Sequence, residues 1–368
     1  MTIHDRTHYR RTLSASVRRL SAAAVAIVLV GGALTLVGGV PQSAAAGAAN
    51  LYVANSFNGT ITEYAPGANG NVAPIATISG LNQPWALVLD TSDDLWVTDY
   101  SGNTVTEYAP GANGNVAPIV TISGNNTGLS NPAGLAIDRS GDVFVGNVGT
   151  NTITEYAPGA NGNVAPIATI SGLSLPFGVA IDASGNLFAT NLGTNTITEY
   201  APGANGNVAP IATISGLNGP IAISFSPSGN LFAANDNNNT ITEYAPGANG
   251  NVAPIATISG LSLPRGVVVD PAGNLFVGNT GAGTVPEYAP GANGNVAPIA
   301  TISGLNGPIG VAVEGTFEGP APATPPSVSS VSPNTGPSTG GTVVTITGSG
   351  FAGATEVDFG DPPATNVS

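Results

Sequence analysis

The 368-residue sequence contains no cysteine and no lysine, and its two histidines stand at positions 4 and 8. Without cysteine no disulfide can brace the fold, so stability outside the cytosol must come from packing. After residue 46 the chain lacks histidine, cysteine and lysine altogether. These residues supply the usual general base near neutrality, the thiolate nucleophile, the Schiff-base amine and the imidazole ligand of zinc. Their absence disfavours most enzyme mechanisms.

Charged residues are also scarce, at 8% of the chain, and the basic ones gather at the N-terminus. Five of the seven precede residue 20, and beyond it Arg139 and Arg265 stand against twenty carboxylates, a net charge of −18. Such a surface repels phosphate backbones and anionic lipid headgroups. The composition therefore excludes nucleic acid as a partner.

The first 46 residues resemble a bacterial secretory signal peptide. The basic stretch is followed by the apolar run Leu20–Val40 and by "PQSAAAGAAN", where Ala44 and Ala46 fit the small-x-small cleavage rule. An uncleaved anchor is the alternative, because 21 residues can span a bilayer. On either reading we expect the rest of the chain in the cell envelope or the extracellular medium, with no transmembrane segment once the signal is cleaved.

The segment "EYAPGANGNVAPI" (Glu63–Ile75) occurs six times, at a period of 44 residues and once of 48. Each unit holds four short β-prone runs between turn residues, which is the pattern of a β-propeller blade. The chain opens on a second strand, Leu51–Asn55, and ends on a first one, Ile309–Glu314. The sequence therefore predicts an all-β fold over residues 47–316, a six-bladed β-propeller of four-stranded blades closed by that C-terminal inner strand.

The unit "GLSLPFGVAIDASGNLFATN" with its later "NTITEY" resembles the NHL-repeat family over residues 49–314. After a Pro-rich linker at 317–328, residues 329–368 are similar to the IPT/TIG family of Ig-like domains. The resemblance rests on Pro333, Gly336, Gly340–Thr342, Val344–Ile346, Gly348–Phe351 and Phe359–Gly360. Ser368 falls about halfway through such a domain, so a partial Ig-like β-sandwich is expected.

The repeated loop itself has two interpretations, a sixfold binding element or a structural joint. Pro66–Gly67 and Asn69–Gly70 are turn dipeptides, which a joint would need. The spacers "GLSLP" and "GLNGP" alternate from blade to blade, as duplication of a two-blade segment would produce. We therefore interpret the loop as a recently copied joint, and we look for function among the positions that differ between the copies.

The middle residue of the P-x-G joint, which leads into each inner strand, varies, and it is expected near the mouth of the central channel. On the same face, the residues just beyond the second strands vary as well. From these two sets we predict a ligand site at Arg265, Trp85, Phe177, Tyr100 and Asp236. Arg265 is expected to anchor a carboxylate or a sugar-like ligand beside the aromatic rings.

Two further sets of recurring polar residues, the hairpin aspartates and the residues that end the second strands, can be explained by turn formation. The hairpin aspartates could hold Ca²⁺ through oxygen ligands, or they could form Asx turns with their own backbone. These are Asp90, Asp93, Asp94, Asp138, Asp142, Asp182 and Asp270. A second set at the ends of the second strands is expected to cap turns; it comprises Asn55, Asp99, Asn147, Asn191, Asn235 and Asn279.

The function predicted from the sequence is a monomeric, non-catalytic binding or structural module for an extracellular ligand, a carbohydrate or a protein. No catalytic residue, cofactor or resident metal is predicted, with Ca²⁺ left open. The alternative is a divalent-metal-dependent lactonase-type hydrolase, because gluconolactonase-like propellers bind a metal through carboxylate and asparagine at the channel mouth. Here Glu314 is the sole glutamate on an inner strand. Streptogramin lyases share this propeller style, but their histidine has no counterpart in this chain.

Overall fold

The computed structural model describes residues 49–316, 327–332 and 345–349. Residues 49–316 form six four-stranded antiparallel sheets, numbered here as blades 1 to 6. Blade 1 contains β24 (Pro308–Val313), β1 (Leu51–Asn55), β2 (Thr60–Tyr64) and β3 (Ala76–Ser79). Blade 2 contains β4 (Pro84–Leu89), β5 (Leu95–Asp99), β6 (Thr104–Tyr108) and β7 (Val120–Ile122). Blade 3 contains β8 (Pro132–Ile137), β9 (Val143–Asn147), β10 (Thr152–Tyr156) and β11 (Ala168–Ile170).

Blade 4 contains β12 (Val179–Ile181), β13 (Leu187–Asn191), β14 (Thr196–Tyr200) and β15 (Ala212–Ile214). Blade 5 contains β16 (Pro220–Phe225), β17 (Leu231–Asn235), β18 (Thr240–Tyr244) and β19 (Ala256–Ile258). Blade 6 contains β20 (Pro264–Val269), β21 (Leu275–Asn279), a 3-10 turn η1 (Thr280–Ala282), β22 (Val285–Tyr288) and β23 (Ala300–Ile302).

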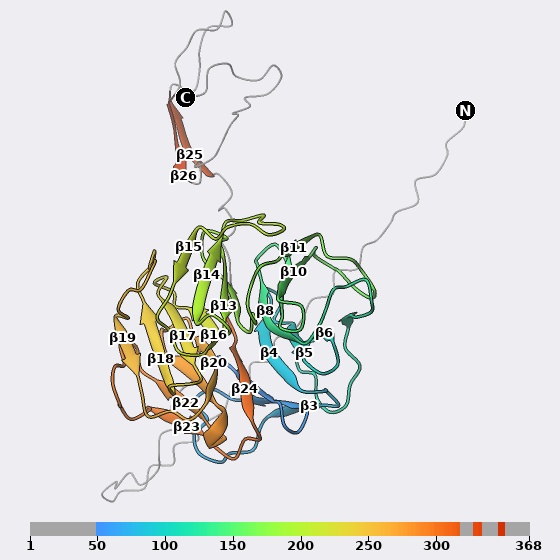
Figure 1. Cartoon of the computed structure of the whole chain (residues 1–368), viewed down its shortest axis with the longest axis vertical. Helices are drawn as coiled ribbons and strands as arrows, with labels where there is room; N and C mark the ends of the chain where they lie inside the picture. Colours follow the sequence, from blue (N-terminus) through green and yellow to red (C-terminus); the bar gives the residue numbers. More distant parts are fainter. Residues whose placement is uncertain (1–48, 317–326, 333–344, 350–368) are drawn as a thin grey trace, which may run out of the picture. The chain divides into compact units, whose positions relative to one another are not determined.

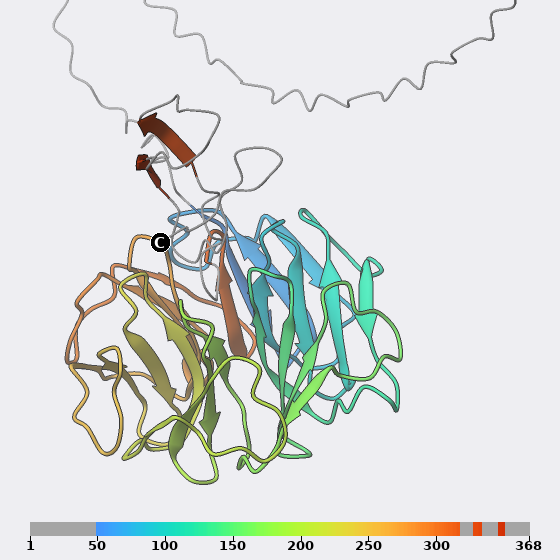
Figure 2. The ribbon, with the colours of Figure 1, turned by 90° about the horizontal axis from the view of Figure 1, so that it is seen from above.

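The six blades stand around a ring (Figures 1 and 2), which confirms the predicted six-bladed propeller. The predicted closure is confirmed as well, because β24 pairs antiparallel with β1 in the register Leu51↔Val313. Asn50 strengthens this closure, because its backbone N–H and side-chain amide both donate to the Glu314 carboxylate, at 3.1 and 3.0 Å. The first and last strands of the ring thus complete one sheet.

The hydrophobic core lies between neighbouring blades. One buried cluster combines Tyr52 and Ile61 of blade 1 with Leu87 and Val97 of blade 2. Each of the other five boundaries between neighbouring blades, which we call seams, has an equivalent cluster. Strands of alternating β-branched residues can pack in this way because successive side chains point to opposite faces of a sheet. Each blade is therefore stabilised by both of its neighbours, and the ring by its closure.

The repeated loops join neighbouring blades. In the loop of blade 4, the Asn205 side-chain oxygen accepts from the backbone N–H of Thr169 in blade 3 at 3.0 Å. Gly206 donates to the carbonyl of the same threonine at 2.8 Å and forms a parallel bridge with Ile170. The equivalent contacts recur at all six seams, including that of Asn69 with Thr301 between blades 1 and 6. This explains why the asparagine–glycine pair recurs: it links two sheets as well as forming a turn.

We expect Asn205→Ala to lower the free energy of unfolding by about 1 kcal/mol, the scale of one net hydrogen bond. Val208→Thr in the same loop is the matched control, because Val208 is 37% exposed and a surface change there should cost less than about 0.5 kcal/mol. Chemical denaturation of both variants measures the difference. Equal effects of the two substitutions would contradict a role of the asparagine in joining the blades.

The predictions for the chain outside the ring lie mostly beyond the described residues. The signal peptide at 1–46 lies entirely outside them, as does most of the linker and of the Ig-like segment. Two paired strands are described there, β25 (Ser327–Ser332) and β26 (Thr345–Ser349). β25 begins two residues before the expected domain start at 329. Within the described parts of the chain, no helix is long and apolar enough to cross a bilayer.

Candidate functional site

The middle residues of five of the six P-x-G joints line the central channel. In blades 1, 2, 3, 5 and 6 the register shifts directly after the proline. Inner strands are sheet edges, where proline is tolerated, and a bulge at an edge redirects the following residue. The joint residues that line the channel are Trp85, Ala133, Phe177, Ile221 and Arg265; Ala133 and Ile221 are buried, and Ile309 does not line the channel. We call the end of the channel at these residues the P-x-G mouth.

Aromatic rings occupy one half of the P-x-G mouth. The Trp85 ring lies 5.0 Å from that of Tyr100 and 5.5 Å from that of Phe177, centroid to centroid, with tilts of 31° and 38°. All three side chains are partly exposed, so ring surface remains open to the channel. Ala133, between Trp85 and Phe177 in the ring order, is fully buried. A small residue there lets the two larger rings meet across blade 3.

An ion pair occupies another part of the mouth. The Arg265 guanidinium donates through Nε and Nη2 to the two carboxylate oxygens of Asp236, at 3.3 and 3.4 Å. Arg265 is on β20, and Asp236 follows β17 in the preceding blade. The forked contact fixes the guanidinium and cancels its charge. The mouth is therefore close to neutral, although the chain as a whole is strongly acidic.

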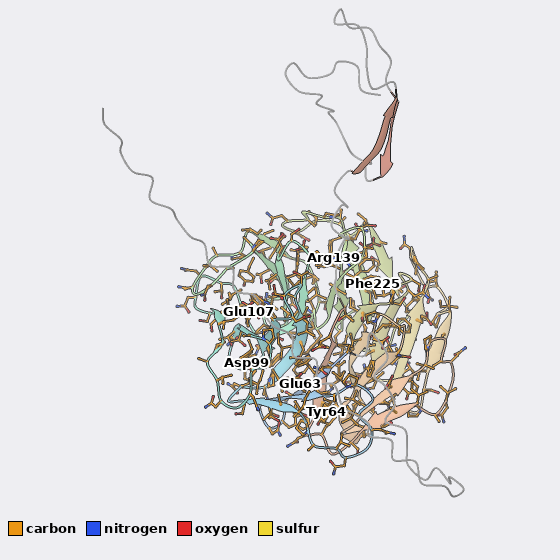
Figure 3. The ribbon with its side chains drawn as sticks, turned by 180° about the vertical axis from the view of Figure 1, so that it is seen from behind. Glu63, Tyr64, Asp99, Glu107, Arg139 and Phe225 are labelled. Atoms are coloured by element: carbon orange, nitrogen blue, oxygen red, sulfur yellow. The ribbon has the colours of Figure 1, made fainter. Side chains whose placement is uncertain are left out.

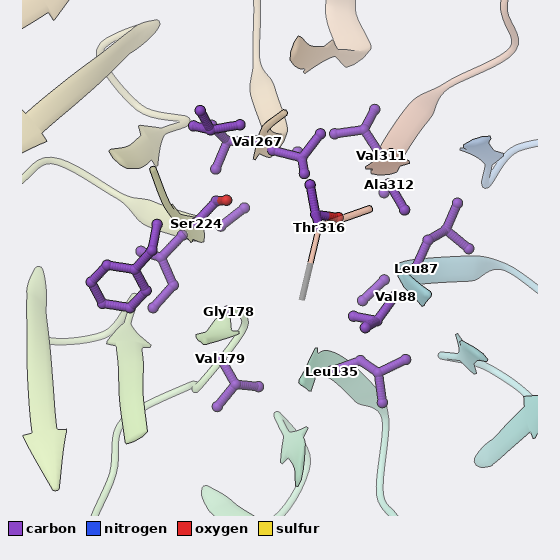
Figure 4. A pocket seen from close by; sticks show the side chains of 18 of the residues that line it. Leu87, Val88, Leu135, Gly178, Val179, Ser224, Val267, Val311, Ala312 and Thr316 are labelled. Atoms are coloured by element: carbon purple, nitrogen blue, oxygen red, sulfur yellow. The ribbon is translucent and has the colours of Figure 1, made fainter. Parts of the chain in front are cut away.

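Below the mouth, the channel is an apolar cavity of about 530 Å³. Aliphatic side chains from all six inner strands line its wall, and Figure 4 labels several of them. They include Leu87, Leu135, Val179, Ile223, Val267 and Val311. The opposite end is lined by Arg139, Asp182 and Thr316. A ligand entering from the P-x-G mouth would thus meet aromatic rings first and a mainly aliphatic wall beyond them.

The hairpins at the opposite end hold the aspartates as Asx turns. Ser92, Ser140 and Ser184 donate their backbone N–H groups to the aspartates two positions earlier, at 2.8 to 2.9 Å. One group there is unusual, because Asp90, Asp94 and Glu107 bring three carboxylates within 4.8 Å of one another. Burial, followed by the charges of Asp94 and Asp90, raises the pKa of Glu107 to about 7. Figure 3 marks Glu107 and Arg139 on the ring.

The residues at the ends of the second strands cap the loops that precede the inner strands, as the sequence suggests. Asp99 accepts from the Asn82 N–H at 2.9 Å, and Asn147 and Asn191 accept from the equivalent serines. Burial raises the pKa of Asp99, and the bond from Asn82 partly offsets this. Asn235 departs from the pattern, since its buried side-chain oxygen has no partner.

The structure brings all five predicted site residues to one mouth, in two groups. Trp85, Phe177 and Arg265 line the cavity, while Tyr100 and Asp236 stand behind them as a stacking and an ion-pairing partner. The pairing of Arg265 with Asp236 was missed by sequence reasoning. They are 29 residues apart, and the available signal was that Asp236 follows the second strand of blade 5 on the face where Arg265 occupies the joint of blade 6.

Residues 326–368 match the family model of the IPT/TIG domain. The comparison with curated proteins found no match. Among solved structures, a protein of unknown function from Bacteroides caccae is similar, with 11% identity, coverage of 72% of this chain and 98% of the other, and a TM-score of 0.54. A chain of a nidogen/laminin complex has 16% identity, coverage of 72% and 98%, and a TM-score of 0.53.

A Bacteroides uniformis protein provisionally described as a 6-phosphogluconolactonase has 17% identity, coverage of 72% of this chain and 84% of the other, and a TM-score of 0.52. At such identities the likeness shows the propeller fold alone, and one fold supports many functions. The NHL resemblance stays a prediction.

Proposed function

We propose that this protein is a non-catalytic binding module of the cell exterior that takes an uncharged, sugar-like ligand at its P-x-G mouth. The observation that carries the proposal is the group of partly exposed rings, Trp85, Tyr100 and Phe177, opening on the cavity. Aromatic faces bury large apolar area at small entropic cost and suit the C–H faces of a sugar ring.

The neutral mouth favours an uncharged ligand over a carboxylate. Asp236 already engages Arg265 through two hydrogen bonds, so a ligand carboxylate would have to compete with it. The remaining N–H donors of the guanidinium can still bind hydroxyl groups. In this arrangement Arg265 is an oriented hydrogen-bond donor. Of the two ligands expected from the sequence, a carboxylate and a sugar-like molecule, we therefore propose the sugar-like one.

Two further residues on this face support a contact surface. Leu175 and Leu263, directly before the prolines of their joints, have φ values of 54° and 50°. The residue before the joint proline is left-handed in all six blades, with Gln83, Asn131, Gly219 and Gly307 at the other four, so the conformation belongs to the repeated turn. Both leucines are exposed, at 38% and 40%, and they flank Phe177 and Arg265 in sequence. They would extend the apolar contact beyond the rings.

The alternative hydrolase would bind its metal through carboxylate and asparagine side chains at the mouth, where the carboxylate of Asp236 is already paired with Arg265. Among the described residues, the charged side chains that line the cavity are Arg139, Asp182 and Arg265. Glu314 instead accepts hydrogen bonds from Asn50 and Tyr52 at the closing seam. A mouth built of rings and a neutralised arginine supports binding rather than metal-assisted hydrolysis.

The proposal predicts that Trp85→Ala weakens the binding of neutral oligosaccharides about tenfold, since a ring contact contributes about 1.5 kcal/mol. Trp85→Phe is the matched variant, because it keeps a ring face and should retain most of the affinity while removing the Trp85 fluorescence response. Binding is measured by calorimetry and fluorescence over a panel of neutral and carboxylated oligosaccharides. An unchanged profile in Trp85→Ala, or binding of carboxylated sugars alone, would contradict the proposal.

A further inference from the structure

The pentapeptide "GLNGP" leads into two inner strands, at Gly216–Pro220 in blade 5 and at Gly304–Pro308 in blade 1. Both copies have an exposed asparagine followed by a buried glycine. The two glycines, Gly219 and Gly307, have nearly the same φ values, 71° and 68°. Local sequence, exposure and φ angle therefore match, and a difference in the reactivity of the two copies must come from the surrounding fold.

The two copies differ in their contact with the preceding blade. The Gly219 N–H donates to the side-chain oxygen of Asn195 in blade 4 at 2.7 Å. In three other blades the residue before the joint proline donates in the same way, also at 2.7 Å, to Asn103, Asn151 or Asn239. Blade 6 has Gly283 at this position, with the same left-handed backbone but no side chain. Within the part of the chain that the structure describes, no residue accepts a hydrogen bond from the Gly307 N–H.

An asparagine followed by glycine is prone to spontaneous deamidation, because glycine has no Cβ to shield its nitrogen. The Gly307 nitrogen would lose its proton to water, form a bond to the Asn306 side-chain carbon Cγ and release the side-chain nitrogen as ammonia. Water then opens the resulting five-membered imide at either C–N bond of its ring, which gives aspartate or isoaspartate. A hydrogen bond from the glycine N–H must break before this nitrogen can react, so such a bond protects the asparagine.

The other asparagine–glycine pairs of the ring have this protection. In each of the six repeated loops the glycine N–H donates to a threonine carbonyl of the neighbouring blade, at 2.7 to 2.8 Å. Gly59 donates to the Asn55 carbonyl at 3.1 Å, and Gly219 donates to Asn195. Among the pairs in residues 49–316, that of Gly307 alone lacks such a bond. We propose that Asn306 is a spontaneous modification site, which converts to aspartate and isoaspartate while the ring is folded.

The modification would weaken the pairing of β24 with β1, which closes the ring. The Asn306 N–H donates to the Asn55 side-chain oxygen at 3.3 Å, and the Asn306 carbonyl accepts from the Phe57 N–H at 3.4 Å. The Gly307 carbonyl accepts from the Ser56 N–H at 3.1 Å. Isoaspartate adds one atom to the main chain between these contacts, so they cannot all be kept.

Peptide mapping by mass spectrometry, with detection of isoaspartate, tests the proposal on the full chain aged at neutral pH. Asn306 should react about fivefold faster than Asn218, the factor expected when one net hydrogen bond is missing. In denaturant the two should react at the same rate, because the segment "SGLNGPI" surrounds both. Equal rates in the folded protein, or no reaction at Asn306 there, would overturn the proposal.

Asn195→Gly is the decisive variant, because it gives blade 4 the residue that blade 6 carries at this position. It should raise the rate at Asn218 in the folded protein to that at Asn306. Asn151→Gly is the matched control, since it frees the N–H of Leu175 and should leave Asn218 unchanged. A rate at Asn218 that does not respond to Asn195→Gly, or that responds equally to both variants, would contradict protection by this bond.

The effect on the closing strand has its own readout. Wild-type protein aged until Asn306 has reacted should melt at a lower temperature than fresh protein. Asn306→Gln should keep its melting temperature over the same period, because the longer side chain forms its cyclic imide far more slowly. An aged wild type that carries isoaspartate at position 306 and melts like fresh protein would show that the pairing of β24 with β1 is not weakened. None of these measurements depends on sugar binding at Trp85.

Discussion

Truncation of the chain after Gly307 is expected to abolish cooperative folding of the ring. The shortened protein lacks β24, so β1 loses its inner partner strand and keeps only β2, and the hydrogen bonds from Asn50 and Tyr52 lose the Glu314 carboxylate. Val311 and Val313 also leave the buried cluster between blades 6 and 1. An open seam with an unpaired strand edge favours aggregation over a stable monomer.

The matched control is truncation after Thr316, which keeps β24 and removes the linker and the IPT/TIG segment. This control should show the unfolding transition of the full chain, as followed by circular dichroism and calorimetry. The chain ending at Gly307 should show no such transition or precipitate. Cooperative melting of the shorter chain at the temperature of the control would contradict closure as the basis of stability.

The fold could be predicted from the sequence because the same pattern of four strands occurs in each of the six repeats. Strand-forming runs separated by glycine, asparagine and proline recur at a fixed period, and a one-strand offset between the ends implies the closing sheet. The hydrogen bonds between blades could not be predicted. The sequence around Asn205 indicates a turn, yet its side-chain oxygen accepts a hydrogen bond from the backbone N–H of Thr169 in the preceding blade. Such contacts depend on the spacing of packed sheets.

The candidate site was predictable in position but only partly in chemistry. Variation between copies located Trp85, Phe177 and Arg265 at one mouth. The neutralisation of Arg265 by Asp236 depends on a 3.3 Å approach across blades that no pattern encodes. Likewise, Asp90, Asp94 and Glu107 are visible in the sequence, but their approach to within 4.8 Å and the burial of Glu107 are results of the fold.

Gly266→Ala is expected to destabilise the protein by about 3 kcal/mol, at the upper end of the usual effect of overpacking. Gly266 pairs with Gly278 in blade 6, and both face the backbone carbonyl of Ile309 in blade 1. A Cβ atom on Gly266 would lie 1.8 Å from that carbonyl oxygen. A backbone oxygen cannot rotate away as a side chain can, so the closing seam would have to widen. Chemical denaturation measures the loss.

Gly102→Ala is the control, because a Cβ there meets its nearest neighbour at an ordinary 3.4 Å. The repeats make this a sharp test, because Ala86 and Ala222 occupy the position of Gly266 in blades 2 and 5. Comparison of the copies would predict that alanine is harmless, whereas the spacing of blades 6 and 1 predicts a severe effect. If Gly266→Ala unfolds like wild type, the seam between blades 6 and 1 tolerates a methyl group and the tight approach there is wrong.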